Sequence, residues 1–346
     1  MASTVGVSAD LGGAFAAACA VGPVVERAFR IGGHELLLRF AGPAVVPAVA
    51  PAFAHLAASP SGQPELVVHI WDSASTGVAP PARPTVQAGE GPGAFYFFED
   101  PPVHGVYQPS VQALSTVDLG TDQAWYWVAD PSGLSYWDRA APLRQILQWW
   151  MAARGHQQVH GGAVGTPEGG VLLVGKGGSG KSTCSLVSLV SELRYGGDDN
   201  MMVSLEPEPW VHSLFSTGTV EPHNLARLPH LEPAVSNSAE LGSEKALIFV
   251  DQHFPDRPID GFPLRAILVP TITGNPHTTV VPASGAAALA ALAPSTVFQF
   301  PTASHEALQS MAALVRALPS YVLEIGSDVS EIPVVILALL DELTPR

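Results

Sequence analysis

The chain has 346 residues, of which 47% are hydrophobic and 14% charged, and its formal net charge is −15. This length favours two domains, and the composition is typical of a folded globular protein rather than a disordered one. Nucleic-acid binding depends on basic surface, so the acidic balance argues against a nucleic-acid partner.

The cysteines and the apolar stretches bear on the cellular compartment. Cys19 and Cys184 are far apart and form no CxxC pattern, which argues against a disulfide framework and a structural zinc site and favours the cytoplasm. The Ala-rich stretch 11–25 is interrupted by glycine and proline, so it predicts a buried helix rather than a signal peptide or membrane helix. The run 332–340 is too short to span a bilayer and predicts a second buried helix.

Residues 1–155 predict a smaller, β-rich α+β domain. Short extended segments at 34–40 and 65–71 are separated by Pro/Gly-rich stretches, and a helix is expected near 46–59. Segments 124–130 and 133–138 flank a Pro-Ser-Gly turn and predict a hairpin. A helix over 141–155 would then join the two domains.

Residues 156–346 predict an α/β domain in which helices flank a mixed sheet. Apolar strands alternate with helical segments along this half of the chain, which is typical of such a sheet. The expected strands are 157–165, 169–175, 246–251 and 264–270, and the expected helices are 182–195, 283–293 and 304–318.

A glycine-rich loop follows the apolar run 171–174. Residues 175–182 read GKGGSGKS and match the phosphate-binding (P-loop) pattern G-x-x-x-x-G-K-[ST]. Glycines let backbone N–H groups converge on phosphate oxygens, Lys181 reaches the β- and γ-phosphates, and the Ser182 hydroxyl binds Mg²⁺. The predicted nucleotide-binding residues are Gly175, Lys176, Gly177, Gly178, Ser179, Gly180, Lys181, Ser182 and Thr183.

Two adjacent carboxylates and one histidine are candidates for chemistry at the phosphates. Asp198 and Asp199 lie at the start of a strand or in the turn before it, where one could accept a hydroxyl proton while the other orients Mg²⁺. By pattern alone, an acidic turn explains them equally well. His160 lies on the strand before the loop strand, and this position makes it a site candidate.

The chain resembles the HPr kinase/phosphorylase family and its wider set of related bacterial serine kinases. The resemblance rests on VHGGAV (159–164), LLVGKGGSGKST (172–183) and LRYGGDDNMMV (193–203), in that order. It implies a P-loop fold similar to phosphoenolpyruvate carboxykinase, ATP and Mg²⁺ as cofactors, and assembly as a homo-oligomer. It also implies that Asp198 is the general base, Asp199 lies near the metal, His160 belongs to an HG pair, and Lys181 binds phosphate.

The sequence departs from the family pattern at two points. Thr183 stands where the family commonly has glutamate after the P-loop serine, and the glycine-rich E-x-R-G-x-G signature has no counterpart. The resemblance therefore implies an HPr-kinase-related serine kinase rather than a true HPr kinase.

Three functions compete at the sequence level. The leading hypothesis is a Mg·ATP-dependent kinase that phosphorylates a hydroxyl, serine on a peptide or small protein. The rival is a P-loop ATPase or GTPase in which Asp251, at the end of the apolar strand 246–250, is a Walker B aspartate. The third is a nucleotide-sensing regulator that transfers no phosphoryl group.

Overall fold

The computed structural model describes residues 4–81, 95–299 and 305–343. The chain divides into two compact units, Met1–Arg154 and Gly155–Arg346. In the described segments, no helix combines the length and apolar character needed to cross a bilayer.

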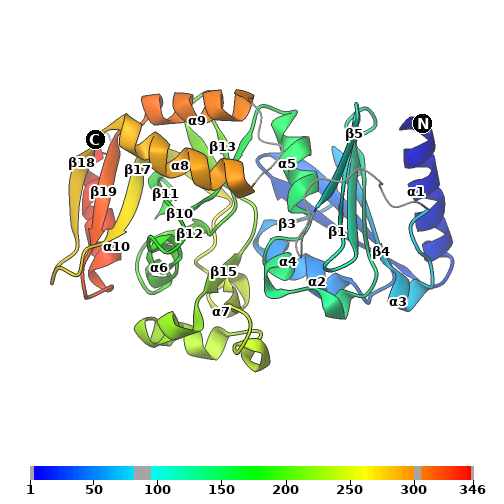
Figure 1. Ribbon diagram of the computed structural model, residues 1–346, viewed down its shortest axis with the longest axis horizontal. Helices are drawn as coiled ribbons and strands as arrows, with labels where there is room; N and C mark the ends of the chain where they lie inside the picture. Colours follow the sequence, from blue (N-terminus) through cyan, green and yellow to red (C-terminus); the bar gives the residue numbers. More distant parts are fainter. Residues whose placement is uncertain (1–3, 82–94, 300–304, 344–346) are drawn as a thin grey trace. The chain divides into compact units, whose positions relative to one another are not determined.

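The first unit is built on one mixed sheet of eight strands in the order β3-β1-β2-β4-β8-β7-β6-β5 (Figure 1). Strands β2, β4 and β8 are parallel neighbours, and the remaining pairs are antiparallel. The strands are β1 Val24–Ile31, β2 His34–Ala41, β3 Ala57–Ala58, β4 Leu66–Asp72, β5 Tyr96–Asp100, β6 Val103–Gln108, β7 Ala113–Asp118 and β8 Gln123–Val128. The helices are α1 Thr4–Cys19, α2 Val46–Val49, α3 Ser73–Thr76, α4 Tyr136–Ala140 and α5 Arg144–Ala152, with 3-10 turns η1 Ala50–Leu56 and η2 Pro131–Gly133.

Helix α1 confirms the prediction of a buried Ala-rich helix. Leu11, Phe15 and Ala18 recur at helical spacing on one side of α1 and are buried. They belong to one apolar cluster with Trp71 of β4 and Trp125 of β8, so the helix covers this face of the sheet.

The predicted hairpin over 124–138 is wrong. Strand β8 pairs with β7 and with β4, and residues 133–138 form no strand. Asp138 accepts hydrogen bonds from the Ser135 hydroxyl at 2.6 Å and the Ser135 N–H at 3.2 Å. This S-x-x-D pairing caps the start of a helix, so the segment becomes α4.

The second unit contains a mixed sheet of nine strands, which confirms the predicted mixed sheet. Its main path is β12-β10-β11-β17-β14-β13-β9, and β19 pairs with β17 and β18. Strands β11, β17 and β19 are parallel neighbours, whereas β15 and β16 form a separate two-stranded sheet. These strands are β9 Gln157–Val159, β10 Gly161–Thr166, β11 Gly169–Val174, β12 Arg194–Gly197, β13 Met201–Ser204, β14 Trp210–Ser213, β15 Thr217–Val220, β16 Ala246–Phe249, β17 Gly261–Ile272, β18 Thr279–Ala283 and β19 Ser320–Ile325.

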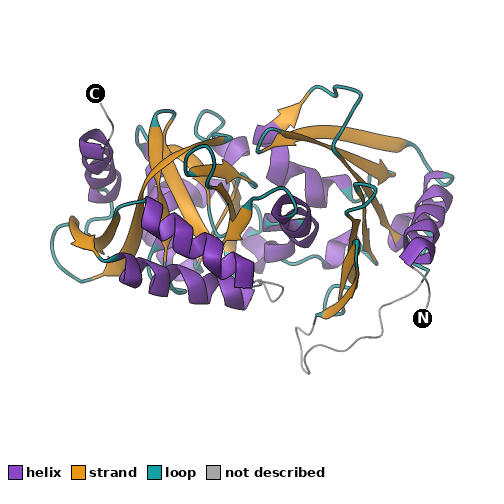
Figure 2. Ribbon diagram, turned by 90° about the horizontal axis from the view of Figure 1, so that it is seen from above, coloured by secondary structure: helices purple, strands orange, loops and turns teal. Residues whose placement is uncertain are grey.

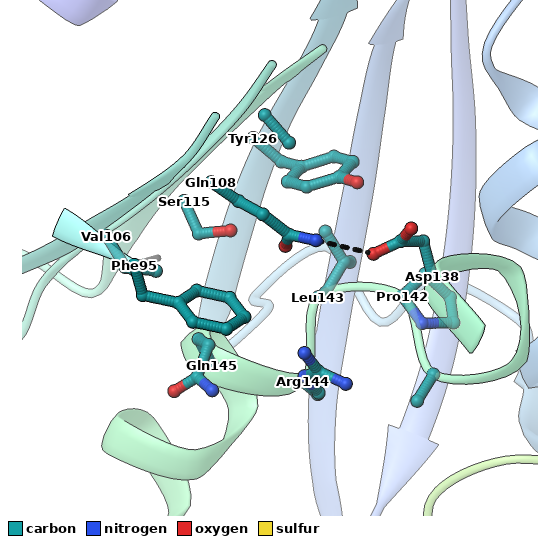
Figure 3. A pocket seen from close by; sticks show the side chains of 12 residues that line it. Phe95, Val106, Gln108, Ser115, Tyr126, Asp138, Pro142, Leu143, Arg144 and Gln145 are labelled. Atoms are coloured by element: carbon teal, nitrogen blue, oxygen red, sulfur yellow. Dashed lines mark hydrogen bonds between the residues drawn. The ribbon is translucent and has the colours of Figure 1, made fainter. Parts of the chain in front are cut away.

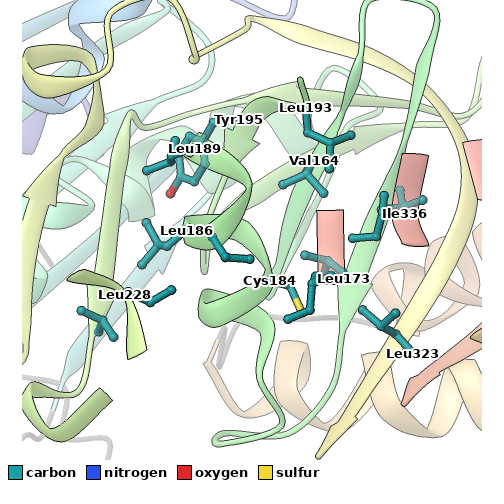
Figure 4. Packing of buried hydrophobic residues seen from close by; sticks show 14 of the residues in the cluster. Val164, Leu173, Cys184, Leu186, Leu189, Leu193, Tyr195, Leu228, Leu323 and Ile336 are labelled. Atoms are coloured by element: carbon teal, nitrogen blue, oxygen red, sulfur yellow. The ribbon is translucent and has the colours of Figure 1, made fainter. Parts of the chain in front are cut away.

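Helices cover both faces of this sheet. Val171 and Leu173 of β11 pack in one cluster with residues of α6 and α10, and Figure 4 shows Cys184 of α6 close to Leu173. Leu172 and Val174, which alternate with them, pack in the other cluster with α8 and α9, which lie side by side (Figure 2). The helices are α6 Lys181–Val187, α7 Val250–His253, α8 Gly285–Gln299, α9 His305–Ala317 and α10 Glu331–Leu343, with 3-10 turns η3 Ser188–Val190, η4 Pro222–Arg227, η5 Pro229–Ala234 and η6 Ser238–Glu240.

Helix α6 is shorter than the sequence predicts, and at its end serine side chains bond to backbone groups beside the 3-10 turn η3. The Ser188 hydroxyl donates to the Cys184 carbonyl at 2.8 Å, and the Ser191 hydroxyl donates to the Ser188 carbonyl at 2.7 Å. The Leu193 N–H then donates to the Ser191 hydroxyl at 3.1 Å. Such local bonds compete with a continuing helix, so the chain turns into β12 instead.

Candidate functional site

The glycine-rich loop connects the end of β11 to the start of α6, as the sequence predicts. Gly175, Gly178 and Gly180 have φ values of 153°, 77° and 107°, which side chains rarely adopt. A Cβ on Gly180 would also lie 2.6 Å from Cδ1 of Ile325, so that side chain would have to move, and the conformation itself favours glycine. The loop therefore presents backbone that no side chain covers at the C-terminal end of β11.

Lys181 folds back over this loop. Its side chain is buried, and Nζ donates to the Gly175 carbonyl at 2.8 Å and to the Lys176 carbonyl at 3.3 Å. Burial lowers the pKa of Lys181, and the charges of Asp198 and Asp199 oppose that shift. An ammonium group has three donors, so it can exchange these loop carbonyls for an incoming anion.

Asp198 is a buried carboxylate in the turn between β12 and β13. It is 5% exposed, and within the described residues neither oxygen accepts a hydrogen bond of normal geometry. Burial, followed by the charge of Asp199, raises the pKa of Asp198 to about 7. The Ser182 side chain, the Lys181 charge and the Thr219 N–H act in the opposite direction, because they favour the ionised form.

Asp199 follows in a left-handed conformation, with φ of 62°. Its side chain is 36% exposed, and Oδ2 accepts a hydrogen bond from the Thr219 hydroxyl at 3.3 Å. The two carboxylates differ in exposure because of this turn, and not because they alternate along a strand. Asp198 is therefore shielded from solvent while Asp199 reaches it.

His160 lies at the break between β9 and β10, so the predicted strand 157–165 is two strands. Its Nδ1 is 3.0 Å from the Asp199 carbonyl oxygen, which can only accept, so Nδ1 carries the proton. The His160 N–H donates to the Thr296 hydroxyl at 3.1 Å. Burial lowers the pKa of His160, and the nearby Asp199 carboxylate opposes that shift. His160 therefore holds the turn that carries both aspartates.

Thr219 and Lys245 belong to this neighbourhood, although sequence reasoning missed them. Thr219, on β15, donates to Asp199. Lys245 directly precedes β16, and its charge lowers the pKa of both Lys181 and His160. Its Nζ lies 3.1 Å from Oε1 of Glu221. The one signal in the sequence was a lone lysine directly before an apolar strand, which is too common to indicate a site.

Asp251 does not occupy a Walker B position. Strand β16 pairs with β15 in the separate two-stranded sheet, whereas the neighbours of β11 are β10 and β17. Asp251 lies in the first turn of α7, after β16 has ended. The geometry therefore places Asp198, rather than Asp251, beside the loop lysine.

The predicted metal ligands, Ser182 and Asp199, supply only part of a metal coordination sphere. Among the described residues, no group of three His, Cys, Asp or Glu side chains is arranged to hold a metal ion. Mg²⁺ bound with a nucleotide takes only one or two protein oxygens and completes its shell with phosphates and water, so Ser182 and Asp199 suit that role. The Ser182 side chain approaches Asp198 closely enough to lower its pKa, so the pairing of Ser182 with Asp199 stays a prediction.

Comparisons with known proteins add a distant structural similarity. No family model matches the chain, and no curated protein matches it. The chain is similar to the solved structure of the HPr(Ser) kinase/phosphatase from Coxiella burnetii, with 14% sequence identity and a TM-score of 0.30, over 54% of this chain and 95% of that one. A similarity this low does not show that the two chains share a family or an activity, so the predicted family stays a prediction.

Proposed function

We propose that the Gly155–Arg346 unit is a Mg·ATP-dependent kinase that transfers a phosphoryl group to a hydroxyl, serine on a peptide or small protein. The observation that carries this proposal is the buried Asp198 carboxylate beside Lys181 and Ser182 of the loop, with its pKa raised to about 7. Burying a carboxylate costs free energy, and such a cost beside a phosphate loop is typical of a functional site.

The loop residues suit the phosphate groups of a nucleotide. The left-handed glycines leave the backbone uncovered, and Lys176, Gly177 and Gly178 are exposed. The buried Ser179 hydroxyl has no hydrogen-bond partner within the described residues, so it can donate to a phosphate oxygen. Lys181 would exchange its bonds to its own loop for phosphate oxygens. When bound, the nucleotide supplies the phosphoryl group, and Mg²⁺ neutralises the charge on its phosphates.

Asp198 suits the role of general base toward the acceptor hydroxyl. A base is most effective when its pKa lies near the working pH, and the pKa of Asp198 is raised to about 7. The Ser182 side chain and the Thr219 N–H favour its ionised form, which is the form that accepts the proton that the hydroxyl loses. Lys181, whose charge acts on Asp198, keeps a useful fraction of the carboxylate ionised at neutral pH.

Asp199 and His160 support this arrangement without transferring the proton. Thr219 and His160 hold Asp199 through its side chain and its carbonyl oxygen, respectively. The partly exposed carboxylate of Asp199 then remains available to Mg²⁺ or its water ligands.

One experiment separates transfer to an acceptor from hydrolysis and from sensing. The full chain is incubated with γ-labelled Mg·ATP and a library of serine-containing peptides, and ADP, free phosphate and phosphopeptide are quantified. A kinase forms ADP and phosphopeptide in equal amounts, and the Asp198→Asn variant loses both. ADP with free phosphate only would show an ATPase, and nucleotide binding with no ADP would show a sensor.

A further inference from the structure

A second candidate site lies in the first unit. A small pocket opens between strands β6, β7 and β8 and the start of α5 (Figure 3). Its volume is about 30 Å³, which is room for about two water-sized groups. Its polar lining consists of Gln108, Ser115, Tyr126, Asp138, Arg144 and Gln145. This pocket lies entirely within residues 95–145 and is independent of the glycine-rich loop.

Arg144 supplies a positive charge that forms no ion pair with the described residues, although Asp138 and Tyr126 act on it electrostatically. Its guanidinium is enclosed by protein atoms, which lowers its pKa to about 10. Its Cζ lies 3.7 Å from the centroid of the Trp137 ring, and neither a hydrogen bond nor an ion pair to the described residues accompanies this stacking. A guanidinium has five N–H donors, so an enclosed one without acceptors is incomplete.

The neighbouring carboxylate is already engaged. Asp138 raises the pKa of Arg144, but its oxygens accept hydrogen bonds from Ser135 and, at 3.2 Å, from Nε2 of Gln108. Figure 3 shows the Gln108 amide pointing toward Asp138, while Arg144 and Gln145 approach from the first turn of α5. Asp138 therefore caps α4 and orients Gln108, and it leaves the donors of Arg144 unused.

Two further features indicate a built site. Gln145 is 6% exposed and lines the pocket, where its Nε2 can donate, whereas its buried Oε1, which only accepts, has no hydrogen-bond partner in the described residues. Leu143, directly before α5, has φ of 60°, a left-handed conformation that residues other than glycine adopt at a cost. This backbone starts the helix such that Arg144 and Gln145 both line the pocket.

We propose that this pocket binds a carboxylate group, with Arg144 donating to both of its oxygens and Gln145 adding a bond through its amide. The planar guanidinium fork matches a planar carboxylate. A phosphate dianion suits the pocket less, because the space is small and Asp138 lies nearby. The carboxylate belongs either to the C-terminus of a peptide or to an acidic side chain.

Calorimetric titration of the full chain distinguishes these sources. The probes are acetate, acetyl-Gly-Ala-Ala with a free carboxylate, the same peptide as its amide, acetyl-Gly-Glu-Ala amide, and inorganic phosphate. We expect binding of acetate and of at least one carboxylate peptide, and none of the uncharged amide. Binding only of the free-carboxylate peptide assigns a C-terminus, and binding of the Glu-containing amide assigns an acidic side chain.

Three variants test the residues. Arg144→Gln weakens carboxylate binding by about tenfold or more, as expected for a lost charge-assisted hydrogen bond. Arg30→Gln removes the same charge from an exposed position of the same unit and leaves binding unchanged. Ala113→Val keeps Arg144 but fills the pocket, so it also weakens carboxylate binding. If Arg144→Gln does not fold, this second variant still tests the proposal.

Three results would overturn the proposal. The first is the absence of binding by any carboxylate probe at millimolar concentration. The second is equal affinity in the wild type, Arg144→Gln and Ala113→Val. The third is tighter binding of phosphate than of every carboxylate probe.

Discussion

The Nδ1 atom of His160 lies 3.0 Å from the carbonyl oxygen of Asp199 and donates to it. This bond ties the β9–β10 junction to the turn between β12 and β13, on which Asp198 also lies. The histidine therefore holds the turn through its backbone, while Nε2 lies 3.9 Å from Oδ1 of Asp199, and substitutions at this position can separate positioning from proton transfer.

Replacement of His160 by asparagine retains most phosphoryl transfer, whereas replacement by alanine does not. An asparagine amide can donate from nearly the place of Nδ1, whereas alanine leaves the Asp199 carbonyl without its partner. His160→Ala lowers the free energy of unfolding by about 1–3 kcal/mol. Urea unfolding and kcat with Mg·ATP check this. Equal loss of kcat in both variants, with normal stability, would assign proton transfer to His160 instead.

Lys181→Ala lowers the affinity for Mg·ATP by about tenfold or more, the cost of one charge-assisted hydrogen bond. Arg316→Ala is the matched control, because Arg316 is an exposed cation of the same unit that lies on α9, outside the loop. Fluorescence titration with a labelled nucleotide measures both. Comparable affinities in the two variants would show that the loop does not bind phosphate through Lys181.

Asp198→Asn stabilises the protein, and more strongly at pH 8 than at pH 5.5. The pKa of Asp198 is raised to about 7 in the folded chain, above the value of about 4 in the unfolded chain. The folded state therefore binds this proton more tightly, and stability falls as the pH rises from about 4 to about 7. The amide avoids that loss, so the gain approaches about 4 kcal/mol at pH 8 and is about 2 kcal/mol at pH 5.5.

Urea unfolding of the wild type and Asp198→Asn at the two pH values measures this gain. Asp256→Asn is the control, because Asp256 is exposed and belongs to the same unit. A gain that is the same at both pH values, or one shared by Asp256→Asn, would refute the raised pKa of Asp198.

Local patterns in the sequence predicted the elements that depend on neighbouring residues. The apolar run 171–174 and the glycine signature after it predicted β11, the loop and the start of α6, because strand burial and glycine turns are local properties. The Ser135–Asp138 pair shows the limit of this approach, since its capping bonds were overlooked and a helix was predicted as a hairpin strand.

Strand pairing and side-chain surroundings depend on distant residues, so the sequence did not predict them. An apolar strand ending at Asp251 looked like a neighbour of β11, but β16 pairs with β15 outside the main sheet. Lys245 and Thr219 reach the aspartates through the same tertiary arrangement. The sequence around Arg144 predicted only a helix. It did not indicate that the Arg144 guanidinium would be enclosed without hydrogen-bond acceptors.

Single-turnover transfer from γ-labelled Mg·ATP to an acceptor peptide, compared between Asp198→Asn and Asp251→Asn, tests the proposed kinase most directly. Asparagine keeps the shape of Asp198 but cannot accept the proton, so we predict that Mg·ATP still binds and transfer falls by about 10²- to 10⁴-fold. Asp251→Asn leaves transfer within about threefold of wild type, because Asp251 lies outside the site. Unchanged transfer in Asp198→Asn together with its collapse in Asp251→Asn would contradict the kinase assignment.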